Sequence, residues 1–132
     1  PQYVVNRIAD ILNIQKKSIN GSKILILGIA YKKDVADTRE SPAWEIIRLL
    51  RQKQAKISYN DPYVRQIKYQ SLSLKSIKIT AENIANYDCV VIIAAHSVYD
   101  HQLIASNAKV IVDTRNALKN IKGVLRKKIV LL

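Results

Sequence analysis

Three short apolar runs constrain the fold of this chain more than any other feature. They are Lys23–Leu27 (KILIL), Cys89–Ala95 (CVVIIAA) and Lys109–Val112 (KVIV). They lack the alternation of polar and apolar residues that a strand with one face in water would show. Runs of this kind are typical of parallel strands that helices cover on both faces.

Helical patterns separate these runs. Apolar residues recur at helical spacing within residues 1–14, and again from Pro42 to about Gln54. Ser41 is a good N-cap and Pro42 suits the first helical position, which marks where the second helix begins. Shorter helices are predicted at Ala81–Asn86 and Val98–Ser106.

Further strands complete an alternating pattern. They are predicted at Lys56–Tyr59, Ser76–Thr80 and Val124–Leu132, whereas residues 63–75 are basic and less periodic. Because strands alternate with helices, we expect an α/β fold: a doubly wound, mostly parallel, Rossmann-like sheet flanked by helices. With 132 residues, the chain has room for one such domain.

The chain is strongly basic. Lys and Arg number 22 against 10 Asp and Glu, which gives a formal net charge of +12 at pH 7. Such a charge suits phosphate-bearing partners, nucleic acids among them. However, the sequence contains no helix-turn-helix signature, Cys/His finger or basic stretch interleaved with aromatic residues, so we expect no nucleic acid partner.

Membrane and metal chemistry are also disfavoured. No apolar run approaches the roughly 20 residues of a membrane span, and no basic segment followed by an apolar stretch opens the chain. We therefore expect no membrane partner and a cytoplasmic location. The single cysteine, Cys89, excludes an internal disulfide and a multi-cysteine metal site, and is interpreted as a small core residue.

The loops after the predicted strands are where we expect a ligand site, because ligands of open α/β sheets collect beyond the carboxyl ends of the strands. Lysine offers a phosphate a point charge and arginine offers a fork, which draws attention to Lys32, Lys33 and Arg115. The alternative is that these are ordinary solvated cations. The chemistry-bearing residues in these loops are Tyr31, Lys32, Lys33, Asp34, Arg39, Asp61, His96, Ser97, Asp113, Arg115 and Asn116.

The first of these loops lacks a dinucleotide fingerprint. The G-x-G-x-x-G pattern needs glycines so that backbone N–H groups can approach a pyrophosphate. Here Gly28 is followed by Ala30 and Lys33 at the next two glycine positions. We therefore do not expect this domain to bind NAD in the usual way.

One long block is recognisable. The segment GIAYKKDVADTRESPAWEIIRLL, followed by a strand and YNDPYV, closely resembles the C-terminal, UDP-sugar-binding domain of the UDP-glucose/GDP-mannose dehydrogenase family. The family pattern is a strand, G-x-A-[FY]-K, an acidic loop, D-x-R-E-S-P, a helix and then Y-D-P. The segments DCVVIIAAHSVYD and VIVDTRNALK are also similar to family segments, so the resemblance covers nearly the whole chain.

The resemblance implies part of an NAD-dependent enzyme that oxidises the C6 hydroxyl of a UDP-sugar to the uronate. It places the NAD-binding domain and the cysteine nucleophile upstream, so this chain alone is expected to be inactive. Residues 1–20 would be the end of an interdomain and dimerisation helix with its linker, and residues 21–132 the UDP-sugar-binding domain. The intact protein would be a homodimer or a higher homo-oligomer that serves polysaccharide biosynthesis.

The resemblance also assigns roles to four residues. Tyr31 and Lys32 match an aromatic–lysine pair that contacts the UDP-sugar, and Arg115 matches a second substrate contact. Arg39 matches an arginine that reaches NAD in the other domain. No catalytic residue and no metal ligand is expected within the chain. The segment DTRNA, residues 113–117, resembles the branch acting on UDP-N-acetylhexosamines more than the UDP-glucose branch.

Structural alternatives stand beside these roles. Arg39 could simply pair with Asp37 or Glu40 and order the loop. His96 is interpreted as a polar loop residue rather than a base, and Asp61 as the cap of the Asn60–Pro62 turn. The whole chain could also be a stand-alone, non-catalytic nucleotide-binding or regulatory module.

Overall fold

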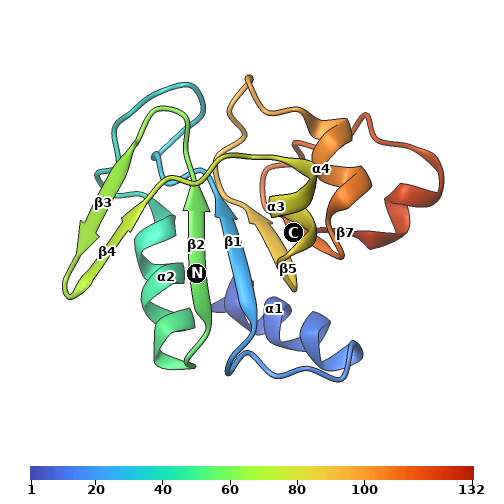
Figure 1. Cartoon of the computed structure of the whole chain (residues 1–132), viewed down its shortest axis with the longest axis horizontal. Helices are drawn as coiled ribbons and strands as arrows, with labels where there is room; N and C mark the ends of the chain where they lie inside the picture. Colours follow the sequence, from blue (N-terminus) through green and yellow to red (C-terminus); the bar gives the residue numbers. More distant parts are fainter.

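A five-stranded parallel sheet, with helices on both faces, forms the centre of the computed structural model, which describes residues 1–132 (Figure 1). Its elements are α1 (Gln2–Ile14), β1 (Lys23–Leu27), α2 (Pro42–Gln52), β2 (Lys56–Asn60), β3 (Gln66–Tyr69), β4 (Leu72–Lys75), α3 (Ala81–Ala85), β5 (Cys89–Ile92), α4 (His101–Asn107), β6 (Ile111–Asp113), a 3₁₀ helix (Gly123–Lys128) and β7 (Ile129–Leu131). No helix among them is long and apolar enough to cross a membrane.

The order of the strands creates a switch point in the sheet. The spatial order is β2-β1-β5-β6-β7, and every neighbouring pair is parallel. From β1 the chain moves outward to β2 and then returns past β1 to β5. The loops after β1 and β5 therefore leave neighbouring strands at the place where ligands of such sheets bind. The expected parallel α/β sheet is confirmed.

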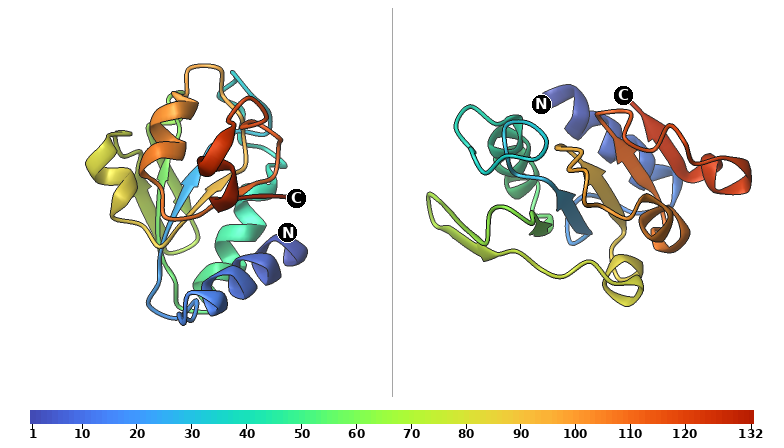
Figure 2. Two further views of the ribbon diagram at one scale, coloured as in Figure 1. Left: turned by 90° about the vertical axis from the view of Figure 1, so that its right-hand side faces the viewer. Right: turned by 90° about the horizontal axis from the view of Figure 1, so that it is seen from above.

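The two covered faces of the sheet explain why the buried residues of the central strands β1 and β5 are all apolar. Ile24 and Ile26 of β1 lie in one core cluster with α1 and α2, whereas Leu25 and Leu27 lie in a second cluster with α3 and α4. Successive side chains of a strand point to opposite faces, so a covered strand needs apolar residues at every position. Figure 2 shows α1 and α2 on one side of the sheet and α3 and α4 on the other.

The cysteine and the start of α2 agree with the sequence predictions. Cys89 is fully buried among the apolar residues of the first cluster. Burial raises the pKa of its thiol to about 12, so it stays protonated and unreactive near neutral pH. Ser41 caps α2 through its Oγ, which accepts from the N–H of Ala43 at 3.1 Å.

Residues 63–80 differ from the sequence analysis, which predicted no element at residues 63–75 and wrongly predicted a strand at Ser76–Thr80. The basic stretch forms an antiparallel hairpin of β3 and β4, seen beside α2 in Figure 1. Ile67, Tyr69, Leu72 and Leu74 alternate with polar residues and face the α2 side, where the ring of Tyr69 stacks on Trp44 at 5.2 Å. The predicted strand at Ser76–Thr80 is absent because its segment runs past the end of β2 without a ladder.

Several element boundaries also differ from their predictions. The helix predicted from Val98 begins at His101, because the carboxylate of Asp100 accepts from the N–H of Leu103 at 3.0 Å and caps the helix there. Residues 124–128 of the predicted last strand belong to the 3₁₀ helix, which leaves only Ile129–Leu131 to pair with β6.

Candidate functional site

A cationic cavity of about 430 Å³ lies at the carboxyl ends of β1, β5 and β6. Its charged lining consists of three lysines and one arginine, together with a histidine, and contains no carboxylate. Such a cavity attracts anions, because like charges that line one cleft reinforce each other's field. Its lining residues are Lys32, Lys33, Ala95, Ser97, His101, Arg115, Asn116, Ala117 and Lys119.

Arg115 is held in place by the turn after β6. The fully buried carboxylate of Asp113 accepts from the backbone N–H groups of Arg115, Ala117 and Leu118 at 3.0, 3.1 and 2.9 Å. The Nε of Arg115 donates to the carbonyl of Ile93 at 2.8 Å, just past β5. The rest of the guanidinium fork remains available to a ligand, which suits recognition of a phosphate.

The loop after β1 approaches the loop after β5 through a glycine. Gly28 has φ +90°, and a Cβ added to it would lie 2.5 Å from the Cβ of Ala94. Only glycine fits both this left-handed conformation and this close approach. Beyond it, the N–H of Tyr31 donates to the carbonyl of Asp37 at 2.7 Å and closes the loop on itself.

The structure brings some of the predicted site residues together and separates others. Lys32 and Arg115 line the same cavity. Tyr31, 48% exposed, lies instead beside a neighbouring hollow of about 440 Å³, together with Arg39. The four residues therefore fall into two pairs on adjacent parts of one surface.

Arg39 forms an ion pair within its own loop. Its Nε and Nη2 donate to the two carboxylate oxygens of Asp37 at 3.0 and 2.8 Å. Hydrogen bonds from Arg39 lower the pKa of Asp37 to about 2. This ion pair matches the structural alternative, in which Arg39 pairs with Asp37 and orders its own loop. To reach a ligand elsewhere, Arg39 would have to break this ion pair.

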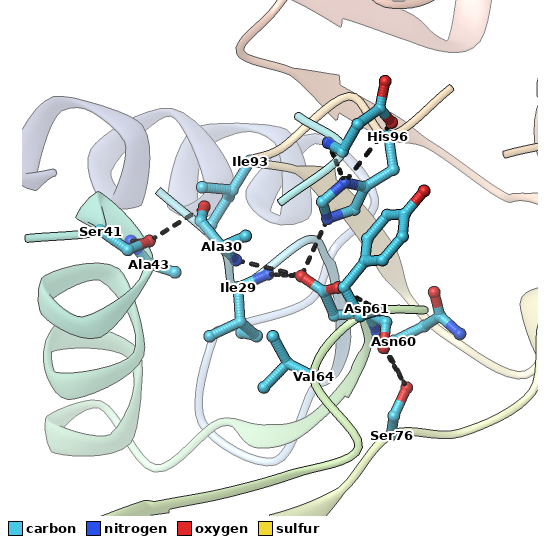
Figure 3. Close-up of polar contacts among 12 residues, drawn as sticks. Ile29, Ala30, Ser41, Ala43, Asn60, Asp61, Val64, Ser76, Ile93 and His96 are labelled. Carbon is cyan, nitrogen blue, oxygen red and sulfur yellow. Dashed lines mark hydrogen bonds and ion pairs between the residues drawn. The ribbon is translucent and has the colours of Figure 1, made fainter. Parts of the chain in front are cut away.

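His96 and Asp61 form a buried pair that the sequence interpretation missed (Figure 3). His96 follows β5 as the expected polar loop residue, but it is fully buried, and Asp61 is only 1% exposed. The carboxylate of Asp61 lies 2.9 Å from Nε2 of His96 and accepts from the N–H groups of Ile29 and Ala30 at 2.8 and 3.0 Å. It also accepts from Tyr63 N–H at 2.9 Å, as the predicted turn cap would.

The remainder of the molecule offers no stronger site. No group of three or more His, Cys, Asp or Glu side chains is placed to hold a metal ion. A larger hollow of about 740 Å³ lies at the opposite end of the sheet, where Lys16, Lys17 and Lys53 line it together with apolar and uncharged polar residues of α1, α2 and surface turns. The cavity at the carboxyl ends of β1, β5 and β6 differs from that hollow because it includes an arginine and lies at the edge of the sheet where ligands of such sheets bind.

Comparison with known proteins identifies relatives of the whole chain. Residues 25–120 match the sequence profile of the UDP-glucose/GDP-mannose dehydrogenase family, UDP binding domain. The UDP-N-acetyl-D-mannosamine dehydrogenase of Methanococcus vannielii is 31% identical in an alignment 128 positions long, which covers 91% of this chain and 28% of that protein. The chain therefore spans less than a third of the length of this curated relative.

Solved structures agree with the sequence match. The UDP-D-ManNAc dehydrogenase of Pyrococcus horikoshii shares the fold with a TM-score of 0.78 at 23% identity, over 99% of this chain and 30% of that one. The NDP-N-acetyl-D-galactosaminuronic acid dehydrogenase of Methanosarcina mazei has a TM-score of 0.75 at 27% identity, over 100% of this chain and 28% of that one. Both the expected family and the expected fold are confirmed.

Proposed function

Because the chain belongs to the UDP-glucose/GDP-mannose dehydrogenase family and carries its UDP-binding domain, we propose that the cationic cavity binds the diphosphate of a UDP-sugar. The observation that carries this proposal is the convergence of Lys32, Lys33 and Arg115 on one cavity without a carboxylate. A diphosphate supplies the negative charges that such a group of cations can neutralise, and the fork of Arg115 can bind two of its oxygens.

Tyr31, Lys32 and Arg115 are the proposed substrate contacts. Lys32 and Arg115 would reach the phosphates, and the half-exposed ring of Tyr31 would meet an adjoining part of the ligand. Arg39 is proposed to contact NAD held by another domain. For this, its guanidinium must break its hydrogen bonds with Asp37 and bind the cofactor instead. No part of this chain is proposed to bind NAD by itself.

The whole protein is proposed to oxidise the C6 hydroxyl of a UDP-sugar to the uronate with NAD. The names of two relatives favour an N-acetylated hexosamine over glucose. The NAD-binding domain and the nucleophile would lie in upstream sequence, so the present chain alone is expected to be inactive. The proposal includes a cytoplasmic location, a role in polysaccharide biosynthesis and a homodimer or higher homo-oligomer.

The proposed domain division places a connecting helix at residues 1–20 and the UDP-sugar-binding domain at residues 21–132. Val5, Ile8 and Leu12 of α1 are fully buried against α2 and the sheet. A helix packed in this way would transmit the position of an upstream domain rigidly to the cavity.

Calorimetric titration with UDP, UDP-GlcNAc and NAD tests the proposal. We expect the uridine nucleotides to bind and NAD not to bind. Lys32→Ala should weaken UDP binding about tenfold, because it removes a charge-assisted contact. Lys68→Ala is the matched control, since Lys68 is an exposed lysine on β3, away from the cavity. No heat with any uridine nucleotide would refute the proposal, and tight binding to RNA or DNA instead would favour a nucleic acid partner.

A further inference from the structure

We propose that His96 is a positioning residue that holds Lys32 and Lys33 at the cavity by joining the loops after three neighbouring strands. Its Nε2 lies 2.9 Å from Oδ2 of Asp61, after β2. Its Nδ1 accepts from the backbone N–H of Asp34, after β1, at 2.7 Å. His96 itself follows β5. We call Asp61, His96 and Asp34 the His96 bridge. The inference rests on the proposed function, because it concerns the residues assigned there to the diphosphate.

The two contacts of the imidazole determine where its proton lies. A ring nitrogen that accepts from an N–H must carry a lone pair, so Nδ1 of His96 is unprotonated. The only ring proton is then on Nε2, which donates to the carboxylate of Asp61. The neutral Nε2–H form is the one ring state that satisfies both neighbours, and a proton on Nδ1 would oppose the N–H of Asp34.

The inner end of the His96 bridge, formed by His96 and Asp61, is sealed from water, whereas Asp34 at its outer end is exposed. The side chains of His96 and Asp61 are both 0% exposed. The rings of Tyr63 and Tyr99 pack edgewise on the imidazole, with centroid distances of 4.9 and 5.6 Å. Without competing water, these hydrogen bonds are stronger and the loss of either partner is costly.

The outer end of the His96 bridge is where it reaches the cavity. Asp34 has φ 61°, a left-handed conformation that residues other than glycine adopt only when their surroundings support it. Its carboxylate accepts from the N–H and Oγ of Ser97 at 2.7 and 2.6 Å. Lys32 and Lys33 directly precede Asp34, and both line the cavity with Ser97. The position of Asp34 therefore sets where the two cations lie.

The same geometry argues against a role for His96 in proton transfer. Both ring nitrogens are occupied by protein partners, and the ring has no exposed surface. A general base must lie within hydrogen-bonding reach of the group it deprotonates. His96 acts on the ligand only through Asp34 and the lysines.

Two substitutions test the contacts of the two ring nitrogens of His96 one at a time. In His96→Asn, the amide oxygen can stand near the position of Nδ1 and accept from Asp34. In His96→Gln, the amide nitrogen can stand near Nε2 and donate to Asp61, but nothing replaces Nδ1. We expect His96→Gln to bind UDP about tenfold more weakly than the wild type, and His96→Asn to recover most of that affinity. Both variants are compared with the wild type by calorimetric titration and by thermal unfolding.

Two binding results would overturn the proposal. One is wild-type UDP affinity in His96→Gln. The other is an equal loss of affinity in both variants that follows their loss of melting temperature, because a purely structural role would not distinguish the two ends of the ring. Weaker binding by His96→Gln at a melting temperature similar to that of His96→Asn supports the proposal.

A nuclear magnetic resonance experiment tests the His96 bridge without any ligand. The ¹⁵N shifts of the imidazole should show a lone pair on Nδ1 and a proton on Nε2, and the amide of Asp34 should exchange slowly with water. That protection should survive in His96→Asn and disappear in His96→Gln. A proton on Nδ1, or unchanged protection in His96→Gln, would overturn the bridge. Failure of the wild type to bind UDP would instead refute the proposed function, and would leave these NMR results to decide on the bridge.

Discussion

Single residues at the carboxyl end of the sheet are specified by backbone geometry as much as by side-chain chemistry. Gly28 lets the loop after β1 pass against Ala94, and Asp61 secures the next two residues of that loop through their N–H groups. Because the same loop carries Lys32, a shift of the backbone at Gly28 would also displace Lys32 from its place in the cavity.

Gly28→Ala should therefore destabilise the fold strongly. The left-handed φ of +90° and the 2.5 Å approach to Ala94 together should cost about 3 kcal/mol of unfolding free energy, measured by urea denaturation. Gly21→Ala is the control, because Gly21 also has a positive φ but no atom lies within 4 Å of an added Cβ. It should cost only about 1 kcal/mol. Equal losses of unfolding free energy in the two variants would show that the close approach to Ala94 adds nothing to the cost of Gly28→Ala.

The limits of the sequence prediction are clearest for these residues. Lys32 and Arg115 were selected because the loops after parallel strands meet at one edge of a sheet, and they do line one cavity. The pairing of Asp61 with His96 was not predicted, because 35 positions separate them and no local pattern connects them. Only the register of β2, β1 and β5 brings the two loops together.

At the scale of elements, fully buried strands and well-capped helices were the most predictable parts. The run KILIL coincides with β1, and its four buried positions, Ile24–Leu27, are all apolar because both faces of the strand are covered there. The β3–β4 hairpin was missed because each strand has only four residues, too few for their alternation to stand out in a basic stretch. Its stability depends on tertiary packing, such as the stacking of Tyr69 on Trp44.

The start of α2 supplies a test at this scale. Ser41→Ala removes the cap that accepts from Ala43 N–H, and should lower the free energy of unfolding by about 1 kcal/mol in urea denaturation. Thr80→Ala removes the matching cap of α3, whose Oγ1 accepts from Asn83 N–H at 3.0 Å. Because α3 has five residues and buries only Ile84, that loss should be smaller. A larger loss for Thr80→Ala would contradict this ranking.

At the scale of the whole molecule, one excess of charge has two opposite consequences. The net charge of +12 favours the approach of an anionic ligand to the cavity. The same charge destabilises the compact state by self-repulsion, since only 10 acidic residues face 22 basic ones. Three of those acidic residues are already paired with nearby arginines: Asp10 with Arg7, Asp37 with Arg39 and Glu45 with Arg48.

Added sodium chloride should therefore raise the melting temperature while it weakens UDP binding. Screening at about 0.5 M salt shortens the reach of charge interactions to a few ångströms, which relieves the repulsion between distant lysines and also reduces the attraction of the cavity for phosphate. Scanning calorimetry measures the melting temperature and titration calorimetry measures UDP binding, each at low and at high sodium chloride with the same protein preparation. Sulfate and phosphate are avoided because they could occupy the cavity themselves. A melting temperature that falls with salt would mean that attractive ion pairs dominate the stability of the fold. UDP binding that does not change with salt would contradict the proposed role of the cavity's positive charge.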